Sequence, residues 1–143
     1  MIITLKNFKQ SLFVLAAVFS FGAIVLTTSP AYATTCVQGN WTYGSSGRCV
    51  SDIQDLLNKE GGYLWWANFS YLSVDGQFGP LTKAQVKAFQ AYTGNQQDGQ
   101  VGPHTWSSLC SKAAEVISAY NELGAYKAAS ALNATAYDAG CGI

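Results

Sequence analysis

The stretch VDGQFGPLT occupies residues 74–82, and QDGQVGPHT follows it at residues 97–105. Six of the nine positions are identical in register: an aspartate, a glycine, a glutamine, a second glycine, a proline and a threonine. An Asp-Gly pair favours a tight turn, because glycine readily adopts positive φ and aspartate bonds forward to the backbone. Proline suits the first position of a helix, where its missing N–H costs nothing. Each copy is therefore predicted to form a turn that starts a helix.

Each predicted turn presents one apolar residue, Phe78 in the first copy and Val101 in the second, and we expect both to fill one core from two sides. Most shared residues of the two copies are explained by folding rather than by ligand contact. The aspartates are predicted to cap their turns, while Thr82 and Thr105 either cap helices or offer hydroxyls to a ligand. The residues assigned to this folding motif are Asp75, Gly76, Phe78, Gly79, Asp98, Gly99, Val101, Gly102 and Trp106.

Helical periodicity surrounds the two copies. Apolar residues from Val50 to Leu57 recur at helical spacing, and Gly61-Gly62 is predicted to end that helix. The first copy opens a helix that Gly94 stops, although a capping box between Thr82 and Gln85 would move its start by a few residues. The second copy is predicted to open a shorter helix carrying Trp106, Leu109 and Cys110. Helical spacing then continues to Leu123, before an alanine-rich segment and a tail pinned by Cys141.

The first 33 residues have the features of an export signal. Lys6 and Lys9 form a basic head, an apolar run covers residues 11–26, and Ala31-Tyr32-Ala33 matches the pattern that signal peptidase cuts. A membrane anchor is the competing interpretation, but the run is shorter than the roughly 20 residues a span requires. We therefore expect cleavage after Ala33 and a secreted or cell-wall location, with no membrane association after cleavage.

The charge balance excludes polyanion binding as the expected function. Removing Lys6 and Lys9 from the eight basic residues, against eight acidic residues, leaves a net charge of about −2. Such a chain has no electrostatic footprint for nucleic acid or for an anionic membrane surface.

Four cysteines remain in the exported part: Cys36, Cys49, Cys110 and Cys141. An even count in a small exported chain predicts disulfides, and the absence of a Cys-x-x-Cys pair together with a single histidine argues against zinc. Four cysteines allow three pairings. A nested arrangement of Cys49–Cys110 inside Cys36–Cys141 would clamp opposite ends of a compact unit and is favoured, with the other two pairings left open.

The segment from Cys49 to Cys110 resembles the three-helix peptidoglycan-binding domain found beside many bacterial cell-wall hydrolases. The matching positions are Ile53-Gln54-x-x-Leu57, Asp75–Thr82, Gln85-Val86-x-x-Phe89-Gln90 and Asp98–Leu109. Two departures stand out: Gln85 replaces the family's usual alanine, and the aromatic segment at 63–72 is longer than a typical connector.

The resemblance implies an all-α, three-helix core, here with an extra C-terminal helical segment and disulfide staples. We divide the chain into a signal peptide (1–33), an irregular arm (34–48), the peptidoglycan-binding-like domain (49–110) and a helical extension and tail (111–143). The resemblance also implies binding of peptidoglycan, through its glycan strand or its stem peptide. We expect no cofactor, and a separate cell-wall hydrolase is a candidate partner.

Candidate ligand contacts are residues that the core does not require. The segment 63–72 is dense in aromatic rings, which can stack on the apolar faces of sugars, while polar side chains serve hydroxyls and amides. Because Trp65 and Trp66 are adjacent, only one of them is expected to face the interior. Covering one end of the core is the equally weighted alternative for these rings. The candidates are Tyr63, Trp65, Trp66, Tyr71, Gln77, Thr82, Gln90, Asn95, Gln100 and Thr105.

The sequence does not favour catalysis. A zinc peptidase requires three ligands of the His/Asp/Glu kind, and His104 is the only histidine. The carboxylates are scattered, and no Ser-His or Cys-His pair stands out. We therefore expect a binding module, and the alternative is a secreted adaptor that uses the same fold to dock another protein.

Overall fold

The computed structural model describes residues 35–143, so the predicted signal peptide at 1–33 and its cleavage site lie outside the described residues. The elements are a 3₁₀ turn η1 (Cys36–Gln38) and helices α1 (Arg48–Leu64), α2 (Pro80–Thr93), α3 (Pro103–Glu122) and α4 (Tyr126–Ala139). The expectation of an all-α fold with an extra C-terminal helix is confirmed. Among the helices of residues 35–143, none combines the length and the apolar character needed to cross a membrane.

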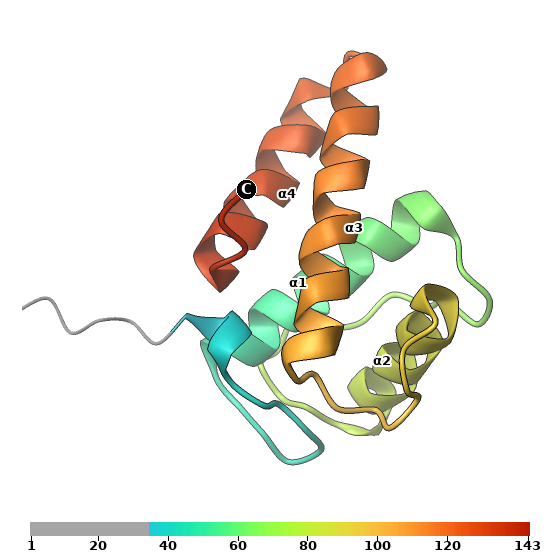
Figure 1. Cartoon of the computed structure of the whole chain (residues 1–143), viewed down its shortest axis with the longest axis vertical. Coiled ribbons are helices and arrows are strands. Elements are labelled where there is room, and N and C mark those ends of the chain that lie inside the picture. The colour runs from blue at the N-terminus through green and yellow to red at the C-terminus, as the bar shows by residue number, and fades with distance from the viewer. Residues whose placement is uncertain (1–34) are drawn as a thin grey trace, which may run out of the picture. The chain divides into compact units, whose positions relative to one another are not determined.

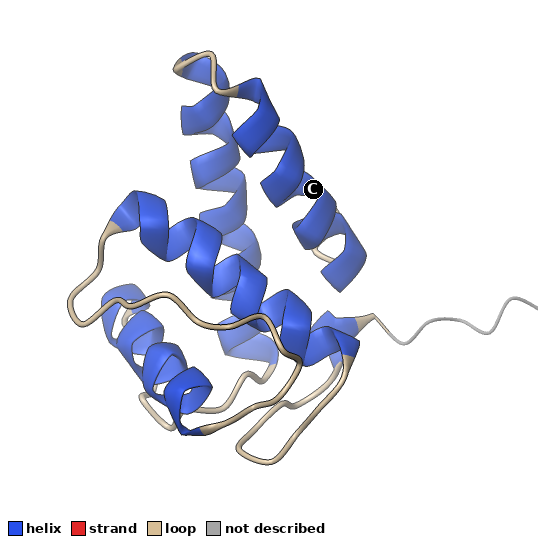
Figure 2. Cartoon of the chain, turned by 180° about the vertical axis from the view of Figure 1, so that it is seen from behind, coloured by secondary structure: helices blue, strands red, loops and turns tan. Residues whose placement is uncertain are grey.

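Helix α1 lies at the centre of the packing and contacts α2, α3 and α4. Helices α3 and α4 lie side by side and antiparallel, as both views show (Figure 1, Figure 2). Phe78 and Val101 are both buried in the shared core, as expected from the two copies of the motif. The largest fully buried apolar side chains of this core are Trp106, Phe78, Phe89, Ile53, Leu56, Leu57, Leu109 and Leu132.

Both copies of the motif start helices in the predicted way. Pro80 and Pro103 are the first residues of α2 and α3, with Gly79 and Gly102 as the N-caps. The alternative start through a capping box at Thr82 therefore does not apply. Helix α2 ends at Gly94, whose φ of 73° is the left-handed conformation that glycine accommodates.

The second helix-starting copy opens a longer helix than predicted. Instead of a short helix to Cys110, α3 runs unbroken for 20 residues to Glu122. Ala113 and Val116 continue the buried face of Leu109, so packing against α4 stabilises the added turns. The expected boundary between residues 110 and 111 therefore falls inside one helix.

The prediction that Gly61-Gly62 ends the first helix is wrong. Helix α1 passes through both glycines and ends at Leu64, with Trp65 as its C-cap. A Cβ on Gly61 would collide with the ring of Phe69, and a Cβ on Gly62 would lie 2.6 Å from the Tyr71 hydroxyl oxygen. The glycines therefore let the aromatic connector approach the helix surface.

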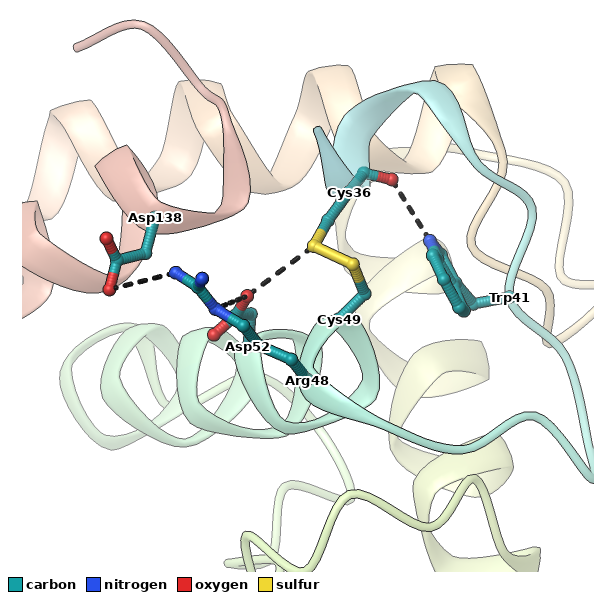
Figure 3. The surroundings of a disulfide bond; sticks show 6 residues. All are labelled: Cys36, Trp41, Arg48, Cys49, Asp52 and Asp138. Carbon is teal, nitrogen blue, oxygen red and sulfur yellow. Dashed lines mark hydrogen bonds and ion pairs between the residues drawn. A yellow bond between two sulfur atoms is a disulfide. The ribbon is translucent and has the colours of Figure 1, made fainter. Parts of the chain in front are cut away.

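The favoured disulfide pairing is also wrong. All four cysteines are paired, as predicted, but the bonds are Cys36–Cys49, shown in Figure 3, and Cys110–Cys141. The first bond joins the arm to the start of α1. The second joins the end of α4 to α3, because α4 runs back along α3.

The arm at residues 35–47 is ordered by backbone pairing with both copies of the motif. Trp41 exchanges two hydrogen bonds with Val101, at 3.1 and 2.8 Å. Farther along the arm, the amide of Phe78 donates to the Ser45 carbonyl at 2.9 Å, and the Gly47 amide donates to the Gly76 carbonyl at 2.9 Å. The arm thus ties the two turns together.

We predict that Gly61→Ala destabilises the protein, although alanine is ordinarily the better helix residue. The added methyl group has to displace Phe69, and overpacking of this kind costs about 1–3 kcal/mol. Urea unfolding would measure the loss. Gly62→Ala is the matched control in the same helix, since its methyl group meets only the far end of the exposed Tyr71 side chain, which can move aside. Equal stability of the two variants would contradict the close approach of Phe69.

Candidate functional site

A buried glutamine of α1 holds the first copy of the motif. Gln54 is 1% exposed, and its Nε2 lies within hydrogen-bonding distance of Asp75 Oδ1 (2.9 Å), the Gln77 carbonyl oxygen (3.0 Å) and Thr82 Oγ1 (3.1 Å). Its Oε1 accepts from the Gly76 amide at 2.9 Å. One carboxamide therefore joins the turn, the start of α2 and the middle of α1.

Gln90 of α2 does the same for the second copy. Its Nε2 lies 2.8 Å from Asp98 Oδ1, 2.9 Å from the Gln100 carbonyl oxygen and 3.1 Å from Thr105 Oγ1. Its Oε1 accepts from the Gly99 amide at 2.9 Å. The two networks match atom for atom, so the sequence repeat is also a repeat of a polar contact set.

The repeated glycines have two different roles. Gly76 and Gly99 have φ values of 69° and 73°, and this left-handed conformation brings their amides to the buried glutamines. Gly79 and Gly102 have φ values of −87° and −99°, which other residues adopt without strain. The backbone therefore requires only the first glycine of each copy.

Hydrogen bonds lower the pKa of both motif aspartates. The Gln54 side chain, followed by the Gln77 amide, lowers the pKa of Asp75, while the Gln100 amide, followed by the Gln90 side chain, lowers the pKa of Asp98. Both carboxylates are thus held ionised, as acceptors in their turns.

Each network lies beneath a shallow pocket. The pocket of the first copy has a volume of about 220 Å³, and the pocket of the second copy has a volume of about 240 Å³. Gln77 lines the first pocket and the corresponding Gln100 lines the second, and both residues are exposed. Leu81 lines the first pocket where His104 lines the second, so the second pocket is the more polar.

A third feature is the exposed aromatic surface formed by Trp65 and Tyr71. These residues are 72% and 67% exposed, whereas Trp66 is 4% exposed and contacts Phe69 and Phe89. As expected, one of the two adjacent tryptophans faces the core and the other faces solvent. Trp65 has a φ of 49°, a left-handed conformation that bulky residues rarely adopt. This conformation ends α1, and the Trp65 amide donates to the Gly61 carbonyl at 2.9 Å.

The two departures from the family pattern, Gln85 and the long aromatic connector at 63–72, are in direct contact with each other. Gln85 is buried, and its carboxamide donates to the Asn68 carbonyl at 3.0 Å and accepts from the Ser70 amide at 3.2 Å. Asn58 fixes the end of the connector through two hydrogen bonds to the Leu72 backbone, at 2.9 and 2.7 Å. The long connector is thus fastened to α1 and α2, which positions the exposed aromatic surface.

The predicted contact residues fall into separate groups. Gln77 and Thr82 line the first pocket, while Gln90, Asn95, Gln100 and Thr105 line the second. Thr82, Thr105 and Gln90 are buried, with their polar atoms engaged in the two networks. Tyr63 is partly buried and packs edge-on against Tyr120 of α3, at a centroid distance of 5.1 Å, so it lines neither pocket.

Sequence reasoning missed several surface residues. Asn40 of the arm, Gln96 and His104 also line the second pocket, and only the folding of the arm across the turn brings Asn40 there. Tyr92 lines two further hollows, of about 400 and 480 Å³. The sequence did contain a sign of the role of Gln54 and Gln90. Each glutamine directly follows an apolar core residue, Ile53 or Phe89, in the helix that precedes its turn.

Comparison with known proteins relates part of this sequence to one family and to two proteins. Residues 46–109 match the family described as "Putative peptidoglycan binding domain". The zinc D-Ala-D-Ala carboxypeptidase of Streptomyces albus G is 38% identical over 71 residues, covering 50% of this chain and 26% of that protein. An uncharacterized protein of Kitasatospora aureofaciens is 58% identical over 36 residues, covering 25% of this chain and 30% of that protein. The chain therefore spans less than a third of either relative, and no solved structure matches it significantly.

We predict that the free energy of unfolding falls at acidic pH and that part of this fall depends on Gln54 and Gln90. Because the folded-state pKa of Asp75 and Asp98 is lowered from 3.8, their contribution is fully present above that value and is lost as pH falls through the folded-state pKa. Gln90→Leu should weaken this dependence, since it removes a bond that favours the ionised Asp98. Urea unfolding between pH 6 and about pH 2 would measure it, with Gln38→Leu as an exposed control. An unchanged acid slope in Gln90→Leu would contradict this account.

Proposed function

We propose that the domain at residues 46–109, which belongs to the family of peptidoglycan-binding domains, binds bacterial cell-wall peptidoglycan without catalysing a reaction. The observation that carries the proposal is the pair of pockets over the two turns of this segment. Beneath each pocket lies a buried glutamine whose polar atoms are all hydrogen-bonded. Since the networks consume the buried polar atoms, the outward-facing side chains are left for a ligand.

The second pocket suits a ligand rich in amides and hydroxyls. It offers the side chains of Gln100 and Gln96, the imidazole of His104 and the amide of Asn40, whereas the Asn95 Nδ2 donates to Thr93 and Ser108. Such groups pair with the peptide amides of a stem peptide or with sugar hydroxyls. The first pocket, with Leu72 and Leu81, suits a less polar part of the same polymer.

The exposed aromatic surface suits a sugar ring of the glycan strand. The Trp65 indole stands over Phe69 at a centroid distance of 6.1 Å, and Phe69 in turn packs on Tyr71 at 4.9 Å. A ring held in one orientation loses little entropy on binding, and its face matches the C–H face of a sugar.

The disulfides and the family support export to the cell wall, where the predicted signal peptide would direct the chain. The Streptomyces albus relative bears the name of a carboxypeptidase, and the match covers only a quarter of that protein. We therefore infer that hydrolysis of the wall, where it accompanies this chain, belongs to a separate hydrolase.

An adaptor function is the second candidate, and a specific feature favours it. Leu123 and Tyr126 are 72% and 68% exposed where α3 turns into α4, outside the segment that matches the family. Exposed apolar groups of this kind often mark protein contacts. Sedimentation with purified sacculi separates the two functions, because a wall binder pellets with the sacculi and a protein adaptor stays in the supernatant.

We predict that Trp65→Ala weakens sedimentation with sacculi while leaving helical circular dichroism and the melting temperature nearly unchanged. Loss of one stacked ring is expected to cost about 1–3 kcal/mol of binding, by analogy with stacking on nucleic-acid bases. Trp66→Ala should instead destabilise the fold by about 3–5 kcal/mol, because its ring is buried. Tyr126→Ala, an exposed aromatic of α4, is the control. Undiminished sedimentation of Trp65→Ala would remove this surface from the binding site.

We also predict that Gln77→Ala and Gln100→Ala each weaken sedimentation without loss of stability. Each glutamine contributes only its backbone to the turn networks, so truncating the exposed side chain leaves those networks intact. Loss of one ligand hydrogen bond costs about 0.5–1.5 kcal/mol, a several-fold weaker affinity. Gln38→Ala, an exposed glutamine outside both pockets, is the control. If neither variant differs from this control, neither glutamine contacts the wall.

A further inference from the structure

The Cys36–Cys49 disulfide has a chemical neighbour that Cys110–Cys141 lacks among the described residues. Asp52 Oδ2 lies 3.5 Å from Cys36 Sγ, and the Asp52 side chain is only 13% exposed (Figure 3). A disulfide sulfur has no proton to donate, so the ionised Asp52 carboxylate accepts no hydrogen bond from the oxidised form. A Cys36 thiol would gain one.

Charged groups around Asp52 come from two helices. Arg48 of α1 lies 3.9 Å from Asp52 Oδ2 through Nε, and its Nη2 lies 3.3 Å from Asp138 Oδ2 of α4. Burial raises the pKa of Asp52, Asp138 and Asp55 raise it further, and Arg48 opposes them. Asp52 therefore holds a proton more readily than an exposed aspartate does.

The two disulfides also differ in their relation to helix ends. Cys49 is in the first turn of α1, where the helix dipole stabilises a thiolate. Cys141 follows the C-cap of α4, where the dipole disfavours a thiolate, and Cys110 is inside α3. The reduced form of the first pair is thus the better stabilised.

We propose that Cys36–Cys49 is a thiol–disulfide exchange site for an external dithiol, with Asp52 as the proton donor and acceptor for Cys36. Cys36 is 4% exposed and Cys49 is half-buried, so Cys49 is the more accessible partner and the attack of an incoming thiolate is assigned to its sulfur. Attack there forms a mixed disulfide and expels the Cys36 thiolate, which takes the proton from Asp52.

The second step completes the exchange. The remaining thiolate of the external dithiol attacks its own sulfur in the mixed disulfide and expels the Cys49 thiolate at the start of α1. The external dithiol leaves as a disulfide, having supplied two electrons, and the two protein sulfurs are reduced. In the oxidising direction the same carboxylate removes the proton from Cys36.

Opening this bond acts on the arm that joins the two copies of the motif. The arm is fixed at one end by Cys36–Cys49 and along its length by the hydrogen bonds of Trp41 to Val101 and of Ser45 to Phe78. It also supplies Asn40 to the second pocket. Reduction therefore loosens one wall of that pocket while leaving Cys110–Cys141 in place.

The test is a titration of the folded protein with graded ratios of reduced to oxidised dithiothreitol. Alkylation and peptide mass spectrometry then give the reduced fraction of each cysteine pair. We expect Cys36–Cys49 to be half-reduced at a ratio about tenfold or more below that needed for Cys110–Cys141, equivalent to about 30 mV. Reduction of both pairs at one ratio, or of Cys110–Cys141 first, would overturn the proposal.

Two variants test the role of Asp52 as the proton carrier, and amide hydrogen exchange tests the release of the arm. Asp52→Asn should slow reduction of Cys36–Cys49 several-fold and change its pH profile, while Glu122→Gln, at an exposed carboxylate at the end of α3, serves as the control. Equal rates in the two variants would exclude Asp52 as the proton carrier. Hydrogen exchange at the Val101 and Phe78 amides should accelerate on reduction of this bond. Unchanged protection of those amides would refute release of the arm.

Discussion

The rest of this structure depends on one kind of interaction, in which the side-chain amide of a buried glutamine forms hydrogen bonds with the backbone of a tight turn. Gln54 and Gln90 each join a helix interior to a turn and to the first turn of the next helix. A buried amide without partners would cost several kcal/mol, so each glutamine specifies the turn that satisfies it. The left-handed Gly76 and Gly99 are required because their amides have to point back at these side chains.

The same constraint separates folding residues from candidate contact residues. Thr82, Thr105 and Gln90 supply atoms to the networks and are buried, whereas the side chains of Gln77 and Gln100 face outward from the same turns. A pocket over each turn is the consequence, and the two pockets differ because the residue after the proline differs, Leu81 in one and His104 in the other. One repeated scaffold thus carries two chemically distinct surfaces.

The parts outside the repeat fasten onto it. The arm pairs with both turns, and the connector is held by Asn58 and Gln85. Helix α4 is fixed to α1 by Lys59, whose Nζ lies 2.6 Å from Asp55 Oδ2 and 2.7 Å from Thr135 Oγ1. Glu60 is fully buried, and burial raises its pKa well above the ordinary value, so the centre of the packing holds a carboxyl group that favours its neutral form.

The sequence by itself determined the features that depend on local chemistry. The two Asp-Gly turns, the helix starts at Pro80 and Pro103, the stop at Gly94 and the division of Trp65 from Trp66 all follow from near neighbours along the chain. The predicted helix end at Gly61-Gly62 was wrong, because the sequence does not distinguish a glycine that ends a helix from a glycine that makes room for a neighbouring ring. The disulfide pairing depended on distant segments: Thr35 lies against Gly140, so the chain near Cys36 does meet the chain near Cys141, yet their sulfurs bond elsewhere. Only the tertiary structure decided this, because the return of α4 along α3 sets which sulfurs face one another, and no local pattern encodes that direction.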